Sequence, residues 1–195
     1  MEIWIGLGVI LLIVIVVMAI YNKMVVARNT YKNALSQIDV SLKQRHDLIP
    51  TLVETVKGYV KHERETLDAI VTARNEATNA RENLGDMPNP DQMGALAASE
   101  KRLNDGVMKI FALSEAYPDL KASENFRDLQ DQISRLEDKI SSARRGYNLT
   151  VLEYNNTIET VPNNIIAGMF KFNRAQELDF ATEEPAIKNM PEVSF

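Results

Sequence analysis

The chain has 195 residues, with 22 Lys or Arg and 27 Asp or Glu side chains, which gives a formal net charge of −5. This mild acidity, without a basic stripe, argues against nucleic acid as a partner. Cysteine is absent, which rules out lipidation of a cysteine and fits a reducing compartment, and the scarcity of glycine is typical of long helices.

The first predicted element is an apolar segment. Residues 3–20 carry no charged or polar side chain, and as a helix they would span about 27 Å, enough to cross the core of a bilayer. A cleaved secretory signal is the alternative, but it would begin with basic residues and end at a small-residue cleavage site. Only Met1 and Glu2 precede the run, and Tyr21 and Asn22 follow it. We therefore predict an uncleaved transmembrane anchor over residues 1–21.

The charges beside the anchor predict its orientation. No Lys or Arg precedes the apolar run, whereas Lys23, Arg28 and Lys32 follow it. Because positively charged flanks stay on the cytoplasmic side, we expect the N-terminus outside and residues 22–195 in the cytoplasm. The same three side chains are candidates for contacts with anionic lipid head groups.

Three helices are expected beyond the anchor, over residues of about 22–84, 92–117 and 122–161. In each of them apolar residues recur at spacings of three and four, the pattern of an amphipathic or coiled-coil helix. Turn-forming residues at 85–91 and Pro118 separate them. The sequence therefore predicts an all-α protein in which an antiparallel three-helix, coiled-coil-like bundle covers residues 22–161. The tail at 162–195 is predicted to be partly disordered.

The lengths of the predicted helices do not match. The first would be about 95 Å long and the second about 39 Å, so an apolar stripe between about residues 25 and 56 has no obvious partner in its own chain. Either Pro50 breaks the helix, with Asp47 as the N-cap of the next one, or the stripe pairs with a second copy of the protein. We favour self-association, because an apolar stripe left in water would be costly.

Candidate contacts that set helix register or oligomer order lie along the first predicted helix. Arg45, Glu63 and Arg74 fall on its seam, where they are either rim residues or partners of charges on another helix that fix the alignment. The full set of candidates is Leu35, Ile38, Asp39, Leu42, Arg45, Ile49, Glu63 and Arg74.

No pattern in the sequence points to catalysis or to a metal. His46 and His62 are sixteen residues apart, whereas a zinc pair on a helix has its two histidines four apart. A Gly-rich phosphate loop and a recognisable nucleophile motif are both absent. The sequence therefore predicts no enzyme, no cofactor and no metal site.

Several separate blocks of the chain resemble the LemA family, and they occur in the same order. They are residues 28–29, 34–50, 52–59, 62–63, 117–122, 125–126, 143–148 and 154–155. The resemblance covers nearly all of residues 21–172, and it implies a bacterial membrane protein with one N-terminal transmembrane helix and a long helical bundle on the cytoplasmic side. It implies no enzyme and supplies no catalytic residue. The residues most typical of the family are Asp39, Arg45, Asp47, Pro50, Glu54, Gly58, His62, Glu63, Arg144 and Asn148.

These observations favour a membrane-anchored helical scaffold or interaction protein that self-associates at the surface of the bacterial cytoplasmic membrane. One alternative is an adaptor that binds a membrane protease or signalling complex through its C-terminal tail. Another is an oligomer that remodels membranes. The expected partners are the lipid bilayer, a second copy of the chain and a protein that binds the tail.

Overall fold

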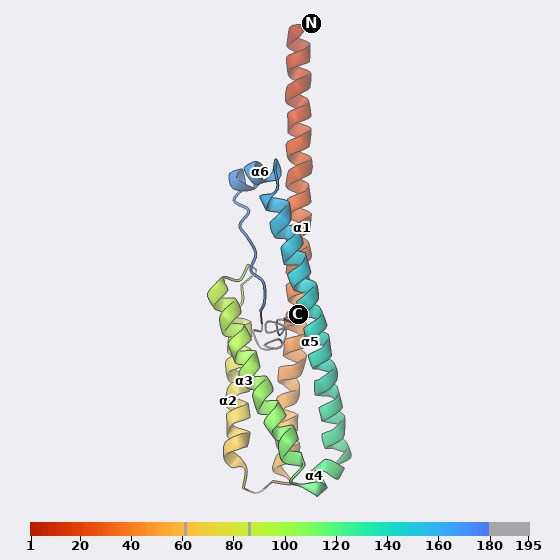
Figure 1. Cartoon of the computed structure of the whole chain (residues 1–195), viewed down its shortest axis with the longest axis vertical. Helices are drawn as coiled ribbons and strands as arrows, with labels where there is room; N and C mark the ends of the chain where they lie inside the picture. The colour runs from red at the N-terminus through yellow and green to blue at the C-terminus, as the bar shows by residue number, and fades with distance from the viewer. Residues whose placement is uncertain (61, 86, 180–195) are drawn as a thin grey trace, which may run out of the picture.

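The computed structural model describes residues 1–60, 62–85 and 87–179, and over these residues the chain is helical with no strand (Figure 1). The all-α class is therefore confirmed. The helices are α1 Glu2–Lys57, α2 Arg64–Glu82, α3 Pro90–Ser114, α4 Pro118–Ala122, α5 Glu124–Glu159 and α6 Asn163–Met169. The predicted helices 92–117 and 122–161 correspond to α3 and α5.

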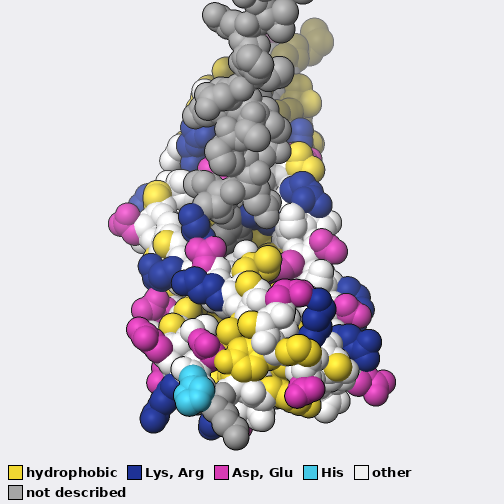
Figure 2. Space-filling view, turned by 60° about the horizontal axis from the view of Figure 1, so that its bottom comes forward, with side chains coloured by type: hydrophobic (Ala, Val, Ile, Leu, Met, Phe, Trp, Pro, Cys, Tyr) yellow, Lys and Arg dark blue, Asp and Glu magenta, His cyan; other side chains and the backbone are white. Residues whose placement is uncertain are grey.

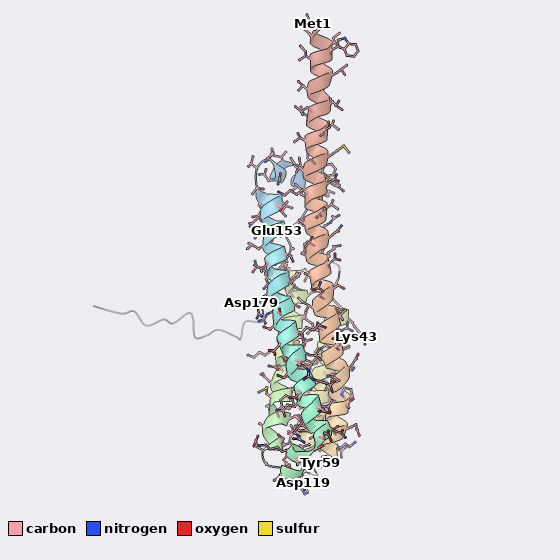
Figure 3. All side chains as sticks on the ribbon, turned by 90° about the vertical axis from the view of Figure 1, so that its right-hand side faces the viewer. Met1, Lys43, Tyr59, Asp119, Glu153 and Asp179 are labelled. Atoms are coloured by element: carbon pink, nitrogen blue, oxygen red, sulfur yellow. The ribbon has the colours of Figure 1, made fainter. Side chains whose placement is uncertain are left out.

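Helix α1 joins the apolar N-terminal segment to the bundle without a break. By length and composition it is the described helix that can cross a membrane. Its first turns project alone beyond the other helices, and all side chains from Met1 to Val16 are exposed (Figures 1 and 3). Its last turns lie in the core, where Leu52 and Val56 are buried. Anchor and bundle therefore share one helix.

The expected single helix over residues 22–84 is wrong, because α1 ends at Lys57 and α2 begins at Arg64. Gly58 is a poor helix former and comes directly after α1. The next N–H groups, of Tyr59 and Val60, both donate to the Val56 carbonyl at 2.9 and 3.1 Å, and the Val60 side chain turns into the core. The apolar spacing resumes in α2 without a change of phase, so the hydrophobic pattern alone did not reveal this turn.

The alternative of a helix break at Pro50, with Asp47 as the next N-cap, is also wrong, since α1 continues through both residues. The stripe on α1 is expected to lack a partner within the chain only if residues 22–84 form one long helix. Since that helix is divided into α1 and α2, this expectation is wrong as well. Helix α5 packs along α1, while α2 and α3 cover the half of α1 that lies far from the anchor (Figure 1). The stripe residues are therefore buried inside one copy: Leu35, Ile38, Leu42 and Ile49.

The bundle has two core clusters along its axis. The cluster far from the anchor contains residues from each of the helices α1, α2, α3, α4 and α5. Examples are Val56 from α1, Ile110 from α3 and Phe126 from α5. The cluster near the anchor is built mainly from α1 and α5, and Met93 and Leu96 at the start of α3 also belong to it. Ile166 of α6 and Leu178 of the C-terminal segment complete this second cluster.

The segment after α5 is ordered as far as the structure describes it. Helix α6 ends in a Schellman motif, with Lys171 at φ 55° and hydrogen bonds from Phe172 N to Ala167 O (2.9 Å) and from Lys171 N to Gly168 O (3.4 Å). The chain then runs back along the bundle as an extended strap, residues 173–178, toward the labelled Asp179 (Figures 1 and 3). The structure gives residues 162–179 a helix and a strap, whereas residues 180–195 lie outside the described residues. The partly disordered tail therefore stays a prediction.

Candidate functional site

A cluster of charged side chains lies inside the bundle, between the two core clusters. Arg45 on α1 and Glu100 on α3 are 3% and 2% exposed. One terminal nitrogen of the Arg45 guanidinium donates to the Glu100 carboxylate, and the other donates to Glu137 on α5. A single arginine therefore ties α1 to two other helices.

The neighbouring His46 extends this cluster to the fourth long helix. Its Nε2 lies 2.8 Å from Glu100 Oε1, and its Nδ1 lies 3.2 Å from Thr78 Oγ1 on α2. Burial alone would raise the pKa of Glu100, but the hydrogen bond with His46 and the positive charge of Arg45 together hold it below its ordinary value. We call Arg45, His46, Thr78, Glu100 and Glu137 the polar junction.

The polar junction contains a Glu–His–Thr row, an order of groups that can activate a hydroxyl nucleophile. Here the Glu100 carboxylate also accepts a hydrogen bond from Arg45, and His46 is fully buried. These three residues therefore have the features of a structural contact between helices. Among the described residues, no group of three His, Cys, Asp or Glu is placed to hold a metal ion. A slip of α1 by one turn, about 5.4 Å, would separate every hydrogen-bonded pair in the junction. That these contacts set helix register stays a prediction.

Pro50 explains a further contact of this cluster. Proline has no N–H, so the carbonyl four residues earlier, that of His46, lacks its usual partner within the helix. The Arg74 Nε on α2 lies 3.3 Å from this carbonyl oxygen and donates to it. Arg74 therefore compensates for the missing hydrogen bond and lets α1 continue through Pro50.

The other predicted contact residues have separate places. Asp39 accepts a hydrogen bond from Arg81 of α2 at 2.9 Å. Glu63 is the N-cap residue of α2 and makes no side-chain cap bond. Asp47 is exposed and pairs with Lys43 at 2.6 Å, and this hydrogen bond lowers the pKa of Asp47. Of the seam charges, the structure brings Arg45 and Arg74 to one cluster and leaves Glu63 in the turn.

A second site lies where α5 holds the strap. The side-chain amide of Asn155 donates to Ala175 O at 3.0 Å and accepts from Ala175 N at 2.9 Å. Asn148 forms the same pair with Leu178, at 3.1 and 2.9 Å. Each asparagine thus satisfies both backbone groups of one strap residue.

Two tyrosines beside these asparagines complete the site. Tyr154 Oη donates to Asn173 O at 2.8 Å, and Tyr147 Oη donates to Gln176 O at 2.6 Å. Burial raises the pKa of Tyr147 well above its ordinary value, so its hydroxyl stays a donor. We call Tyr147, Asn148, Tyr154 and Asn155 the tail clasp.

The spacing of the tail clasp is a consequence of backbone geometry. The two Tyr-Asn pairs are seven residues apart on α5, about 10.5 Å along a helix. The strap residues that they hold are three apart, about 10 Å along an extended chain. The sequence signal for the tail clasp is the Tyr-Asn dipeptide, which occurs at 147–148 and again at 154–155. From the sequence, these residues are interpreted only as part of the helix seam and of the family resemblance.

An aromatic group lies where α1 leaves the bundle. The Tyr21 ring is 4.9 Å from the Phe170 ring and 5.7 Å from the Phe172 ring, and the Arg28 guanidinium lies 5.0 Å over the Phe172 ring. Lys23 is exposed and Lys32 half-buried nearby on α1. The contacts of Lys23, Arg28 and Lys32 with lipid head groups stay a prediction.

The surface far from the anchor has no patch of a single charge on the face that Figure 2 shows. Lys and Arg side chains alternate with Asp and Glu, around a group of hydrophobic side chains. A mixture of both signs is typical of solvated helix surfaces. The predicted absence of a nucleic-acid partner stays a prediction.

Comparisons with known proteins relate the bundle to a family. A family model described as LemA family matches residues 34–195. Protein LemA of Metamycoplasma hominis is 27% identical over 171 residues, which cover 84% of this chain and 74% of that protein. Magnetosome protein MamQ 2 of Paramagnetospirillum magneticum is 22% identical over 185 residues, and Magnetosome protein MamQ of Magnetospirillum gryphiswaldense is 20% identical over 182. The matches to these two cover 85% of this chain and 66% of each relative.

These likenesses and the apolar part of α1 support a membrane-associated helical protein. The family match begins at Ala34, beyond the anchor, so it rests on the bundle and the tail. The names of the relatives state no catalytic activity.

Proposed function

The chain belongs to the LemA family, and from this premise we propose that it is a membrane-anchored helical scaffold that self-associates at the membrane surface. The observation that carries the proposal is the unbroken helix α1, which is shared by the anchor and the bundle core. A bundle on such a helix has a fixed orientation to the bilayer, which a flexible linker would not give. The polar junction adds to this rigidity because it joins all four long helices.

The proposed orientation places the N-terminus outside and the bundle in the cytoplasm of a bacterium. Its support is the positive charge of Lys23, Arg28 and Lys32 on the bundle side of the apolar segment, with no Lys or Arg on the other side. Attaching a reporter enzyme that is active in only one compartment to either end of the chain tests this orientation. Activity of an N-terminal reporter in the cytoplasm would contradict it.

The surface proposed for self-association is a groove between α1 and α5. It has a volume of about 790 Å³, and its lining includes the small residues Ala34, Ser36, Ser142 and Gly146. Small residues allow the backbone of another helix to approach closely. This groove replaces the buried stripe as the candidate contact, since the stripe is covered by the chain's own helices.

The test is the mass of the full chain in mild detergent, measured by light scattering on a sizing column with the detergent contribution subtracted. We expect a defined oligomer for the unmodified chain and a smaller species for Gly146→Trp. Gly94→Trp is the matched control, because an added Cβ meets no atom within 4 Å at either glycine. A monomeric unmodified chain would overturn self-association, and an oligomer that tolerates Gly146→Trp would overturn the groove as its contact.

An adaptor that works through the tail is the second candidate function. The tail clasp favours it, because the clasp contacts backbone atoms of the strap and holds residue 179 at a fixed point on the bundle. Removing residues 180–195 leaves the clasp and the strap in place. Loss of a co-purifying protein with unchanged oligomer mass would support the adaptor, and an unchanged set of co-purifying proteins would count against it.

The remodelling alternative makes a different prediction. An oligomer that bends membranes should change the shape of liposomes in electron micrographs at high protein loading. Smooth, unaltered vesicles would contradict it. We propose no enzymatic activity and no cofactor for this chain.

A further inference from the structure

Helix α6 lies beside the apolar segment of α1, and in this position it would not be surrounded by water if that segment spans a membrane. A groove of about 320 Å³ separates the two elements, and apolar side chains from both line it. On α1 these run from Leu12 to Ile20, and on the α6 side they include Pro162, Ile165 and Ile166. The groove thus extends about 12 Å into the predicted anchor, from Ile20 to Leu12.

The depth of this groove favours a position of α6 in one leaflet of a bilayer. The apolar run of residues 3–20 is about 27 Å long, slightly less than the thickness of a hydrocarbon core of about 30 Å. The run therefore has no length to spare outside the core. If the run spans the bilayer, the residues between Leu12 and Ile20 lie in the leaflet on the bundle side, together with the groove that they share with the α6 residues.

The surface of α6 has the chemistry of that environment. Residues 161–170 contain no charged side chain. Ile165 is 64% exposed, and three further apolar side chains around it are at least half exposed: Val161, Met169 and Phe170. The opposite side of α6, with Ile166 and Ala167, is buried against the bundle core. An apolar element that is buried on one side and exposed on the other is typical of interfacial segments.

The residues around α6 match the boundary between lipid and water. Phe170 and Phe172 pack against Tyr21 in tilted and edge-to-face geometry, and aromatic side chains gather at this boundary in membrane proteins. Lys171 comes directly after the uncharged run, and Lys23 and Lys171 are both exposed. Long cationic side chains can extend from this depth to the head groups.

We propose that α6 and the apolar residues that flank it are inserted in the bundle-side leaflet, so that the protein is held in the bilayer by two elements. The occupant of the exposed face of α6 is lipid, and acyl chains fill the groove between α6 and α1. This inference rests on the proposed spanning anchor. It adds that the bundle is seated against the membrane at its α5–α6 end.

The test uses fluorescence quenching by lipids with bromine on their acyl chains. The chain has a single tryptophan, Trp4, near the far end of the apolar run. In a Trp4→Phe background, Ile165→Trp places an indole on α6, and Leu149→Trp is the control on α5. Leu149 is 67% exposed, close to the 64% of Ile165, and lies about 15 Å along α5 from its end at Glu159. The full chain is reconstituted in phosphatidylcholine vesicles, and Met169→Trp serves as a second probe of α6.

We expect the Ile165→Trp and Met169→Trp indoles to be quenched at least as strongly as Trp4 in the unmodified chain. Bromine near the head-group end of the acyl chain should quench them more than bromine near the chain end. The Leu149→Trp indole should emit as in water and stay unquenched. If Trp4 is quenched and both α6 probes are not, the inference is overturned while the proposed anchor stands. This is the result expected if α6 contacts another protein in place of lipid. If no indole, Trp4 included, is quenched, the spanning anchor and the inference both fail.

Discussion

The Asn155 side chain and the backbone of Ala175 are joined by two hydrogen bonds, one donated in each direction, at 3.0 and 2.9 Å. This pairing gives the strap the hydrogen bonds that a neighbouring strand would give it in a sheet. It explains how an extended segment is held against a helix without a regular ladder. It also shows where the stability of the C-terminal segment can be tested.

Replacing Asn155 by Ala should free the strap locally. The change removes both hydrogen bonds and leaves the Ala175 backbone groups unpaired, at a cost of about 1–3 kcal/mol, or roughly 5- to 150-fold faster amide exchange. Hydrogen exchange of the peptide covering residues 173–179, followed by mass spectrometry on the full chain, measures this. Asn156→Ala on the exposed side of α5 is the control for helix propensity. Equal exchange in the two variants would contradict the clasp.

Arg45→Leu should be among the most destabilising single changes in the bundle. It leaves Glu100 buried beside only His46, and breaking a buried ion pair costs about 3–5 kcal/mol. Arg102→Leu is the control, because Arg102 pairs with Glu76 at 3.0 Å on the surface, where such a pair is worth about 0–1 kcal/mol. Chemical unfolding of the full chain in detergent, followed by circular dichroism, compares them. Similar losses in both variants would show that the polar junction is not a stabilising cluster.

The polar junction should also make the bundle sensitive to acid. The pKa of Glu100 is lower in the folded chain than its ordinary value of 4.5, so its ionised form favours folding. This contribution is complete above pH 4.5 and is lost as the pH falls through the folded pKa.

The acid effect can be separated from that of other carboxylates with Glu100→Gln. The unfolding temperature of the unmodified chain should exceed that of the variant at neutral pH, and the gap should narrow as the pH drops below 4.5. Melting curves over a series of pH values measure the gap. A gap that does not change with pH would rule out Glu100 as the source.

Pro50 and Arg74 should be energetically coupled. In the unmodified chain Arg74→Met removes the donor to the His46 carbonyl, at a cost of about 1 kcal/mol. In a Pro50→Ala background the new backbone N–H can take over that carbonyl, so the same change should cost less. A double-mutant cycle of unfolding free energies should give an interaction of about 0.5 kcal/mol or more. Additive effects would mean that Arg74 does not compensate for the proline.

The sequence predicted the helical architecture where its signal is local. The spacing of apolar residues from Phe126 to Ile158 marked α5, because each turn of the helix repeats the same requirement for a buried side chain. The turn at Gly58 was not predicted, because the spacing of apolar residues keeps the same phase before and after it. This omission changed the predicted architecture, because the turn lets α2 fold back and bury part of the apolar stripe on α1.

Contacts between distant residues were beyond the reach of the pattern. The seam position of Arg45 indicated that it could pair with another helix, but its partners Glu100 and Glu137 lie 55 and 92 residues away. Nothing in their local sequence distinguishes them from solvated carboxylates. The strap was missed for a related reason, because it is held mainly through its backbone and so needs no apolar periodicity.

With the proposed spanning anchor, the shared helix α1 would make the bundle a lever that amplifies the tilt of the anchor. From Ile20 to Lys57 the helix rises about 55 Å beyond the apolar run. Transmembrane helices tilt by about 20° on average, and a thinner bilayer increases the tilt of a helix that is too long for it. A tilt of about 20° would carry Lys57 sideways by about 19 Å, provided α1 stays straight. In a bilayer whose hydrocarbon core is thinner than the apolar run of about 27 Å, the tilt would thus be converted into lateral displacement at the far end of the protein.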